Sequence, residues 1–140
     1  MPTEEQLAVD LLGRVRHGRA ATSMRALPFL APARHIVADG RVLLRLHRGY
    51  GYHRACGGGV VAYGADNLGC ARPGEGLWSV QVVGHCESAD PTPAELDRLG
   101  PGPELVDGEP FDPVHLVIEP RFATVHTIDG GLERRFQHVL

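Results

Sequence analysis

The sequence predicts a mainly β (α+β) fold, in which about six antiparallel strands close into a barrel, with an N-terminal helix and a short inserted helix. Eighteen glycines and eleven prolines, with only 6% aromatic residues, favour short strands and many turns over a helical bundle. Strand-length apolar segments recur between turn residues, and a closed barrel buries many short strands. The 140 residues are 43% hydrophobic and suffice for one apolar core, so we expect a single domain over residues 1–140.

Capping residues predict the two helices. Thr3 and Gln6 form a capping box, and apolar residues follow at helical spacing, so we expect a first helix over residues 4–16, ended by a glycine. Thr92 can cap the second helix, because a proline follows at the first helical position. That helix should end at Gly100.

The strands are predicted from apolar runs between turn signals. Two strands should meet at Asp39-Gly40, the dipeptide that best fits a type I′ hairpin. Pro28 and Pro32 lie in the first of these strands, which should therefore be an edge there or carry a bulge. Further along the chain, a short buried strand, a long strand, and a closing strand or strand pair are expected in "VVAYGAD", "LWSVQVVGHCESAD" and "VHLVIEPRFATVHTI".

Composition narrows the classes of partner. Fourteen cationic residues, all arginine, stand against 17 acidic ones, and a net charge of −3 argues against a nucleic-acid partner. No apolar run reaches the roughly 18 residues that a membrane-spanning helix requires. The opening "MPTEEQLAVDLL" is acidic where a secretory signal would be basic, so we expect a cytoplasmic protein without a membrane partner.

Three cysteines and eight histidines raise the question of a metal. Cys56, Cys70 and Cys86 form no C-x-x-C pair, and we expect them to be reduced thiols in a reducing cytoplasm, with no metal site. A zinc site built from these cysteines and nearby histidines is the alternative, although their spacing does not match known zinc knuckles.

The glycine-rich stretch "RGYGYHRACGGG", residues 48–59, is the first candidate site. It lacks the G-x-x-x-x-G-K-[ST] pattern of a P-loop, and an arginine occupies the position of the third glycine of a dinucleotide fingerprint. Its second half can form a short helical turn with free N–H groups beside a cation, which is suited to an anion. A plain surface loop is the alternative.

Polar residues interrupt two of the predicted strands. Arg34 and His35 follow a proline in an otherwise apolar strand, and Arg45 and His47 alternate with leucines, so those two side chains should share one face. Such residues can mark a pocket mouth or a solvated strand face. Trp78 and Ser79 begin the longest strand, where a tryptophan more often fills a core or an interface. No hydrolase motif is present.

The order of the short motifs resembles a known family. "GRAATS", "LPFLAPARHIVADGRVLLRLH", "VVAYGAD", "LWSVQVVGHCES" and "VHLVIEPRFATVHTI" are similar to the pyridoxamine 5′-phosphate oxidase-like FMN-binding split barrels, in their small bacterial branch. The likeness runs from about residue 4 to residue 128, and Trp78-Ser79-Val80 with Gly84 is its strongest piece.

The resemblance implies a six-stranded split barrel that forms a homodimer, with two flavin sites in the grooves between protomers. Ala33, Arg34 and His35 would flank the isoalloxazine ring. Trp78 and Ser79 would approach the ring from the partner subunit.

The resemblance also implies a phosphate site. Arg45, Leu46 and His47 would reach the ribityl chain and phosphate of FMN, and the glycine-rich loop would complete the site. Relatives usually carry Ser-Lys or Ser-Arg-Lys in this loop, whereas this chain has "YHRA". Arg54 can replace the lysine, since arginine binds phosphate bidentately, and His53 would assist when protonated. The altered loop would also suit a deazaflavin or a member without cofactor.

These features predict an FMN-dependent oxidoreductase of unknown substrate. A deazaflavin-dependent reductase, a non-catalytic binding module with the same barrel, and a zinc or haem protein are the alternatives. Oxidation of pyridoxamine phosphate itself is not expected, because family members with that activity are longer and carry C-terminal substrate-binding residues. Arg134 and Arg135 in the final segment are equally well explained as a solvated tail.

Overall fold

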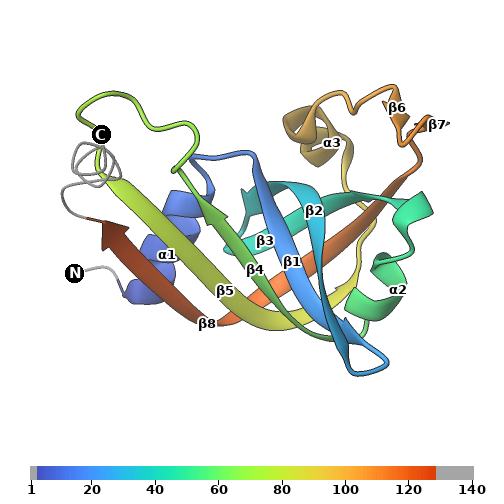
Figure 1. The fold of residues 1–140 in the computed structure, drawn as a ribbon, viewed down its shortest axis with the longest axis horizontal. Coiled ribbons are helices and arrows are strands. Elements are labelled where there is room, and N and C mark those ends of the chain that lie inside the picture. Colours follow the sequence, from blue (N-terminus) through green and yellow to red (C-terminus); the bar gives the residue numbers. More distant parts are fainter. Residues whose placement is uncertain (1–2, 129–140) are drawn as a thin grey trace, which may run out of the picture.

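The computed structural model describes residues 3–128, and six strands form a closed antiparallel barrel in the order β1-β2-β3-β8-β5-β4 (Figure 1). The predicted mainly β fold with an N-terminal helix is confirmed. Arg134 and Arg135 lie outside the described residues. The elements are α1 (Glu4–Leu12), β1 (His17–Met24), β2 (Leu27–Ala38), β3 (Arg41–His47), the 3-10 turn η1 (Arg48–Tyr50), α2 (His53–Cys56), β4 (Gly59–Asp66), β5 (Leu77–Ser88), α3 (Pro93–Leu99), β6 (Leu105–Val106), β7 (Glu109–Pro110) and β8 (Pro113–Ile128).

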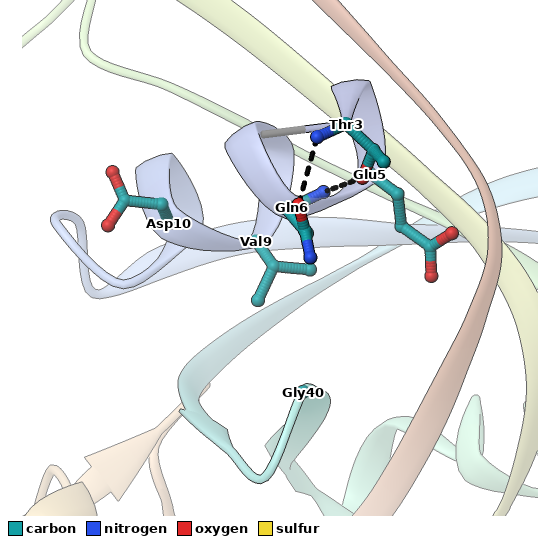
Figure 2. Close-up of a pocket in the computed structure, with 6 residues that line it drawn as sticks. All are labelled: Thr3, Glu5, Gln6, Val9, Asp10 and Gly40. Atoms are coloured by element: carbon teal, nitrogen blue, oxygen red, sulfur yellow. Dashed lines mark hydrogen bonds between the residues drawn. The ribbon is translucent and has the colours of Figure 1, made fainter. Parts of the chain in front are cut away.

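Helix α1 begins at the predicted capping box, which Figure 2 shows as two dashed bonds. The Gln6 backbone N–H donates to Thr3 Oγ1 at 3.1 Å, and the Thr3 N–H donates to Gln6 Oε1 at 2.9 Å. The helix ends at Leu12, so the expectation that it extends to residue 16 is wrong. The Arg16 carbonyl accepts a hydrogen bond from the His35 N–H of β2 at 2.8 Å, so the chain at residue 16 already pairs with the sheet.

The glycine expected to end that helix lies inside β1. A Cβ on Gly18 would come within 2.7 Å of the phenol oxygen of Tyr63 and 2.5 Å of the Gly64 carbonyl. Gly18 therefore allows β1 and β4 to approach each other around a buried tyrosine.

The β2–β3 connection confirms the predicted hairpin. Asp39 and Gly40 have φ values of 54° and 74°, as a type I′ turn requires. Pro28 and Pro32 pair only with β1, because β3 joins β2 from Arg34 onward. The part of β2 that contains the prolines is thus an edge on its other side, as expected.

The closing segment is one bent strand, and the preceding loop is not wholly irregular. β8 pairs with β3 along its first half and with β5 along nearly its whole length, with a bulge at Val83/Gly84. A Cβ on Gly84 would overlap the Glu119 carbonyl, so only glycine fits the bend. The strand pair β6–β7, joined through Asp107 and Gly108, was not predicted.

Two apolar clusters hold these elements. The first fills the barrel and includes the α1 residues Ala8, Leu11 and Leu12. The second lies outside the barrel, where Leu99 of α3 packs on Ile36 of β2 and Leu43 of β3. α3 therefore covers the outer face of β2 and β3, next to the predicted site. No helix among residues 3–128 is long and apolar enough to span a membrane.

Candidate functional site

A row of basic side chains crosses the outer face of the barrel beneath α3. Arg34 of β2 lies opposite Arg45 of β3, and Arg45 lies opposite His115 of β8. The neighbouring Leu44 and Leu46 are buried inside the barrel, so Arg45 and His47 share the opposite face, as strand alternation predicts.

The two arginines of this row bind the C-terminal end of α3. Arg34 donates from Nη2 to the Arg98 carbonyl at 3.0 Å and from Nε to the Leu99 carbonyl at 3.2 Å. Arg45 donates from Nη1 to the Gly100 carbonyl at 2.6 Å and from Nη2 to the Pro101 carbonyl at 3.5 Å. Burial lowers the pKa of both guanidiniums. These arginines do not simply face solvent, since they satisfy carbonyls that a helix end leaves unpaired.

A chain of aromatic rings runs beside Arg45 across the glycine-rich loop. Phe29 stacks on Tyr52 with centroids 4.7 Å apart, and Tyr50 lies 5.6 Å from Tyr52. Tyr50 also meets His47 edge-on at 5.2 Å, and His47 stacks on Phe111 at 5.7 Å. The Arg45 guanidinium lies over the Phe111 ring, 5.7 Å from its centroid. Apolar ring faces and a cation thus occur side by side.

The glycine-rich loop forms the predicted helical turn. After η1, Gly51 adopts φ 77° and the chain enters α2. Arg54 is exposed, and its side chain has no hydrogen bond or ion pair among residues 3–128. The Arg48 Nε lies 3.5 Å from a carboxylate oxygen of Asp112. The loop therefore carries two cations at the surface, of which only Arg48 has a counter-charge within the described part of the chain.

His53, which is expected to assist when protonated, is partly buried beside the loop cations. Its Nδ1 atom is buried and has no hydrogen-bond partner within residues 3–128. Burial lowers the pKa of His53, and the positive charges of Arg48 and Arg54 lower it further. The lowered pKa favours the neutral imidazole, which would offer a bound anion at most one N–H donor.

Three predicted residues of β2 and β3 face the barrel interior. Ala33, His35 and Leu46 are 5%, 0% and 1% exposed. A cofactor on the outside of the barrel would therefore meet their backbone and not their side chains. Arg34 and Arg45, by contrast, do offer side chains on the face that α3 covers.

His35 forms a buried hydrogen-bonded pair with Tyr63. The His35 Nε2–H donates to the Leu12 carbonyl at 2.8 Å, so Nδ1 accepts the Tyr63 hydroxyl at 2.5 Å. Burial lowers the pKa of His35 to about 4 and raises the pKa of Tyr63. The pair connects α1, β2 and β4 inside the core.

Trp78 and Ser79 lie toward the opposite end of β8 from Arg45. They pair with Thr127 and His126 near the end of β8, whereas Arg45 pairs with His115 near its start. The Trp78 side chain packs in the core, and its backbone N–H donates to Asn67 Oδ1 at 2.8 Å. One protomer thus does not bring the ten predicted residues together.

The three cysteines are the remaining candidates from the sequence. Cys56 and Cys86 are buried and Cys70 is exposed, all as free thiols. No group of three His, Cys, Asp or Glu side chains among residues 3–128 is placed to hold a metal ion. A hollow of about 450 Å³ lies between α1 and the turn at Gly40. Its described lining residues, which Figure 2 labels, include no cation and are Thr3, Glu5, Gln6, Val9, Asp10 and Gly40.

Residues 4–123 match the family model described as pyridoxamine 5′-phosphate oxidase. This chain belongs to the pyridoxamine 5′-phosphate oxidase family. The suspected family and its split-barrel fold are thereby confirmed.

Relatives of this family member share its fold. An uncharacterized protein of Mycobacterium tuberculosis is 40% identical over 90 residues, which are 60% of this chain and 58% of the relative. The FAD-binding protein of Mycobacterium smegmatis superposes with a TM-score of 0.64 at 23% identity, covering 87% of this chain and 94% of that one. A heme-binding protein of M. smegmatis gives 0.62 at 12% identity, covering 94% and 56%.

Sequence reasoning missed the aromatic contribution to the site. Tyr50 and Tyr52 lie on either side of Gly51 in the glycine-rich loop. This spacing was the signal that could have indicated an aromatic contribution to the site. Phe111 comes from a distant loop, and no local pattern connects it with His47. Only the β3–β8 pairing, which sets the His47 imidazole to accept the Asp112 N–H at 3.1 Å, brings them together.

Proposed function

We propose that this chain is a flavin-binding oxidoreductase that holds FMN between two copies of the barrel. The observation that carries the proposal is the chain of aromatic rings beside the cations of β3 and the glycine-rich loop. Flat rings and an adjacent basic end suit a ligand that joins a ring system to a phosphate. The FAD-binding protein among the structural neighbours supports the same ligand class.

The phosphate would bind at the loop. Arg54 is exposed and has no partner among the described residues, and Arg48 is held only by the long contact to Asp112 within that range. Both guanidiniums can turn toward an anion and bind it through two N–H groups each. Arg45 would contribute mainly its charge, because Gly100 and Pro101 already accept its hydrogen bonds.

A second copy of the chain would complete the site. Leu30, Ala21, Ala62, Val83 and Phe122 lie in one register row across five strands of the outer face. Leu30 is 59% and Phe122 73% exposed. An apolar row of this length on a single protomer favours burial against another protein surface. A copy packed there would add its Ser79 side chain and the backbone of Trp78 to the groove.

The flavin would supply the hydride or electron chemistry, and the protein would bind, orient and shield it. We assign no general acid or base to the described residues beside the aromatic rings. His35 and Tyr63 are buried and paired with each other, and the pKa of His53 is lowered. Alignment of a substrate against the flavin would therefore be the main contribution of this chain.

Two alternatives keep the same barrel. A deazaflavin has a similar ring system and phosphate, and the loss of the loop serine and lysine favours a different cofactor. A non-catalytic binding module is favoured by the carbonyl-bound state of Arg34 and Arg45, which leaves fewer free donors for a ligand.

The test is the spectrum and mass of the small molecule that co-purifies. An FMN protein should absorb near about 370 and 450 nm, as free flavins do. A deazaflavin would be identified by its mass, and turnover of a nicotinamide nucleotide would separate an enzyme from a binding module. A colourless protein that cannot be reconstituted with FMN contradicts the proposal.

A further inference from the structure

A basic pocket lies on the opposite edge of β2 from β3. It occupies about 290 Å³ between the α1–β1 connection, the edge of β2 and the end of α3. Within residues 3–128, no Asp or Glu lines it. Its lining residues are Gly13, Arg14, Val15, Arg16, Arg34, His35, Ile36, Val37 and Arg98.

The four arginines differ in how many of their N–H donors already have a hydrogen-bond partner. Arg14 pairs with Asp10 at 2.9 Å, one turn back along α1. Arg34 and Arg98 are held by backbone carbonyls, Arg98 through one bond from Nη2 to the Val37 carbonyl at 2.7 Å. The Arg16 side chain has no hydrogen bond or ion pair within residues 3–128. Because each guanidinium has five N–H groups, Arg16 and Arg98 together retain many free donors.

The positive charge of the pocket has no matching carboxylate among its described lining residues. Burial lowers the pKa of Arg34, and the charges of Arg16, Arg45 and Arg98 lower it further. His17, opposite Arg34 in the sheet, has a pKa lowered by burial and then by Arg34 and Arg16. The chain as a whole has a net charge of −3, so this cluster is a local concentration of positive charge on a negatively charged protein. A bound anion would relieve the repulsion.

We propose that this pocket binds the phosphate group of a small metabolite. Arginines from three elements, the α1–β1 connection, β2 and α3, surround it, which suits a tetrahedral dianion better than a planar carboxylate that one guanidinium can match. A space of about 290 Å³ admits a small phosphate ester but is at the lower limit for a drug-sized ligand.

This pocket is separate from the proposed flavin-phosphate loop. Residues 35–37 of β2 bind β3 along one edge and face the pocket along the other, whereas Arg48 and Arg54 follow the end of β3. None of the loop residues lines the pocket. Arg34 and His35 line the pocket and are also expected to flank the flavin ring, so the two sites would be adjacent. The inference nevertheless does not require a phosphate in the glycine-rich loop.

Titration calorimetry with inorganic phosphate tests the proposal, at constant ionic strength set with potassium chloride. Arg16→Ala removes an exposed side chain that binds no other described residue, so the fold should persist. We expect this substitution to weaken phosphate binding by about tenfold or more, as the loss of a charge-assisted contact implies. Arg25→Gln, at the far tip of the same β1–β2 hairpin, removes the same charge and should leave the affinity unchanged.

Three outcomes would overturn the proposal. Equal losses in Arg16→Ala and Arg25→Gln would mean that phosphate responds only to net charge. Loss in Arg54→Ala alone would place the phosphate in the glycine-rich loop, which would support the flavin anchor and not this pocket. Acetate binding as tight as phosphate binding would show that the pocket does not select a tetrahedral dianion.

Discussion

Arg34 and Arg45 lie directly opposite each other on β2 and β3, and together they bind the four consecutive carbonyl oxygens of residues 98 to 101. The last carbonyls of a helix have no partners within the helix. Arg34 supplies partners for the Arg98 and Leu99 carbonyls at the end of α3, and Arg45 supplies partners for the next two carbonyls along the chain. Hydrogen bonds from these two arginines thus hold the end of α3 against the outer face of the barrel. The same guanidiniums could otherwise bind a phosphate.

Replacing Arg45 should loosen α3. Arg45→Ala removes two hydrogen bonds from a half-buried charged group, and we expect the free energy of unfolding to fall by about 1–3 kcal/mol. Urea denaturation measures the change, and hydrogen exchange should rise near residue 100. Arg41→Ala on the same strand is the control, since its exposed side chain makes no hydrogen bond among the described residues. Equal stability of the two variants would refute the fastening role.

His35 should make the stability depend on pH. Its pKa is about 4 in the folded chain against an ordinary value of 6.5. Between these two pH values, the histidine is therefore mostly protonated in the unfolded chain and mostly neutral in the folded chain. The stability is therefore full above about pH 6.5 and decreases as the pH falls toward 4, by up to about 3 kcal/mol.

The comparison of wild type with His35→Gln isolates this effect. The variant should be less stable at pH 7 but should lose less of its remaining stability between pH 7 and pH 5, as measured by urea denaturation. His126→Gln, an exposed histidine, controls for the general titration of the chain. Parallel pH curves for wild type and His35→Gln would assign the dependence to other groups.

Arg54→Ala tests the proposed phosphate anchor. The variant should bind FMN more weakly by about 2 kcal/mol, because one charge-assisted contact is lost. Fluorescence titration of the apoprotein gives the affinity. Arg72→Ala, whose side chain is exposed in another loop, should bind as wild type does. An unchanged affinity in Arg54→Ala would identify another cation as the anchor.

Phe122→Glu tests the proposed interface between copies. Placing a charge at the 73% exposed end of the apolar row should shift the chain to a monomer in analytical ultracentrifugation. If the flavin site needs both copies, the same variant should lose bound flavin. Leu105→Glu, which is 60% exposed on β6 away from that row, is the matched control. A wild-type chain that already sediments as a monomer would contradict the interface.

Local sequence signals were sufficient for most of the elements. The Thr3 and Thr92 capping boxes, the positive φ of Asp39 and Gly40, and the prolines on the open edge of β2 depend on interactions within a few residues. The first helix was predicted too long, because periodic apolar residues up to Val15 suggested helix while the β2 edge captured the chain at Arg16. The outcome of this competition between helix and sheet depends on tertiary contacts, which the local sequence does not reveal.

The candidate site shows the same division. From the sequence alone came the family, the barrel, and the alternation that places Arg45 and His47 on one face, because these follow from local patterns and motif order. Only the folded chain decided which partners those side chains have: the carbonyls of Gly100 and Pro101 for Arg45 and the Phe111 ring for His47. Residues more than fifty positions apart meet through strand pairing and the path of α3 over the barrel, and a one-dimensional pattern does not encode that path.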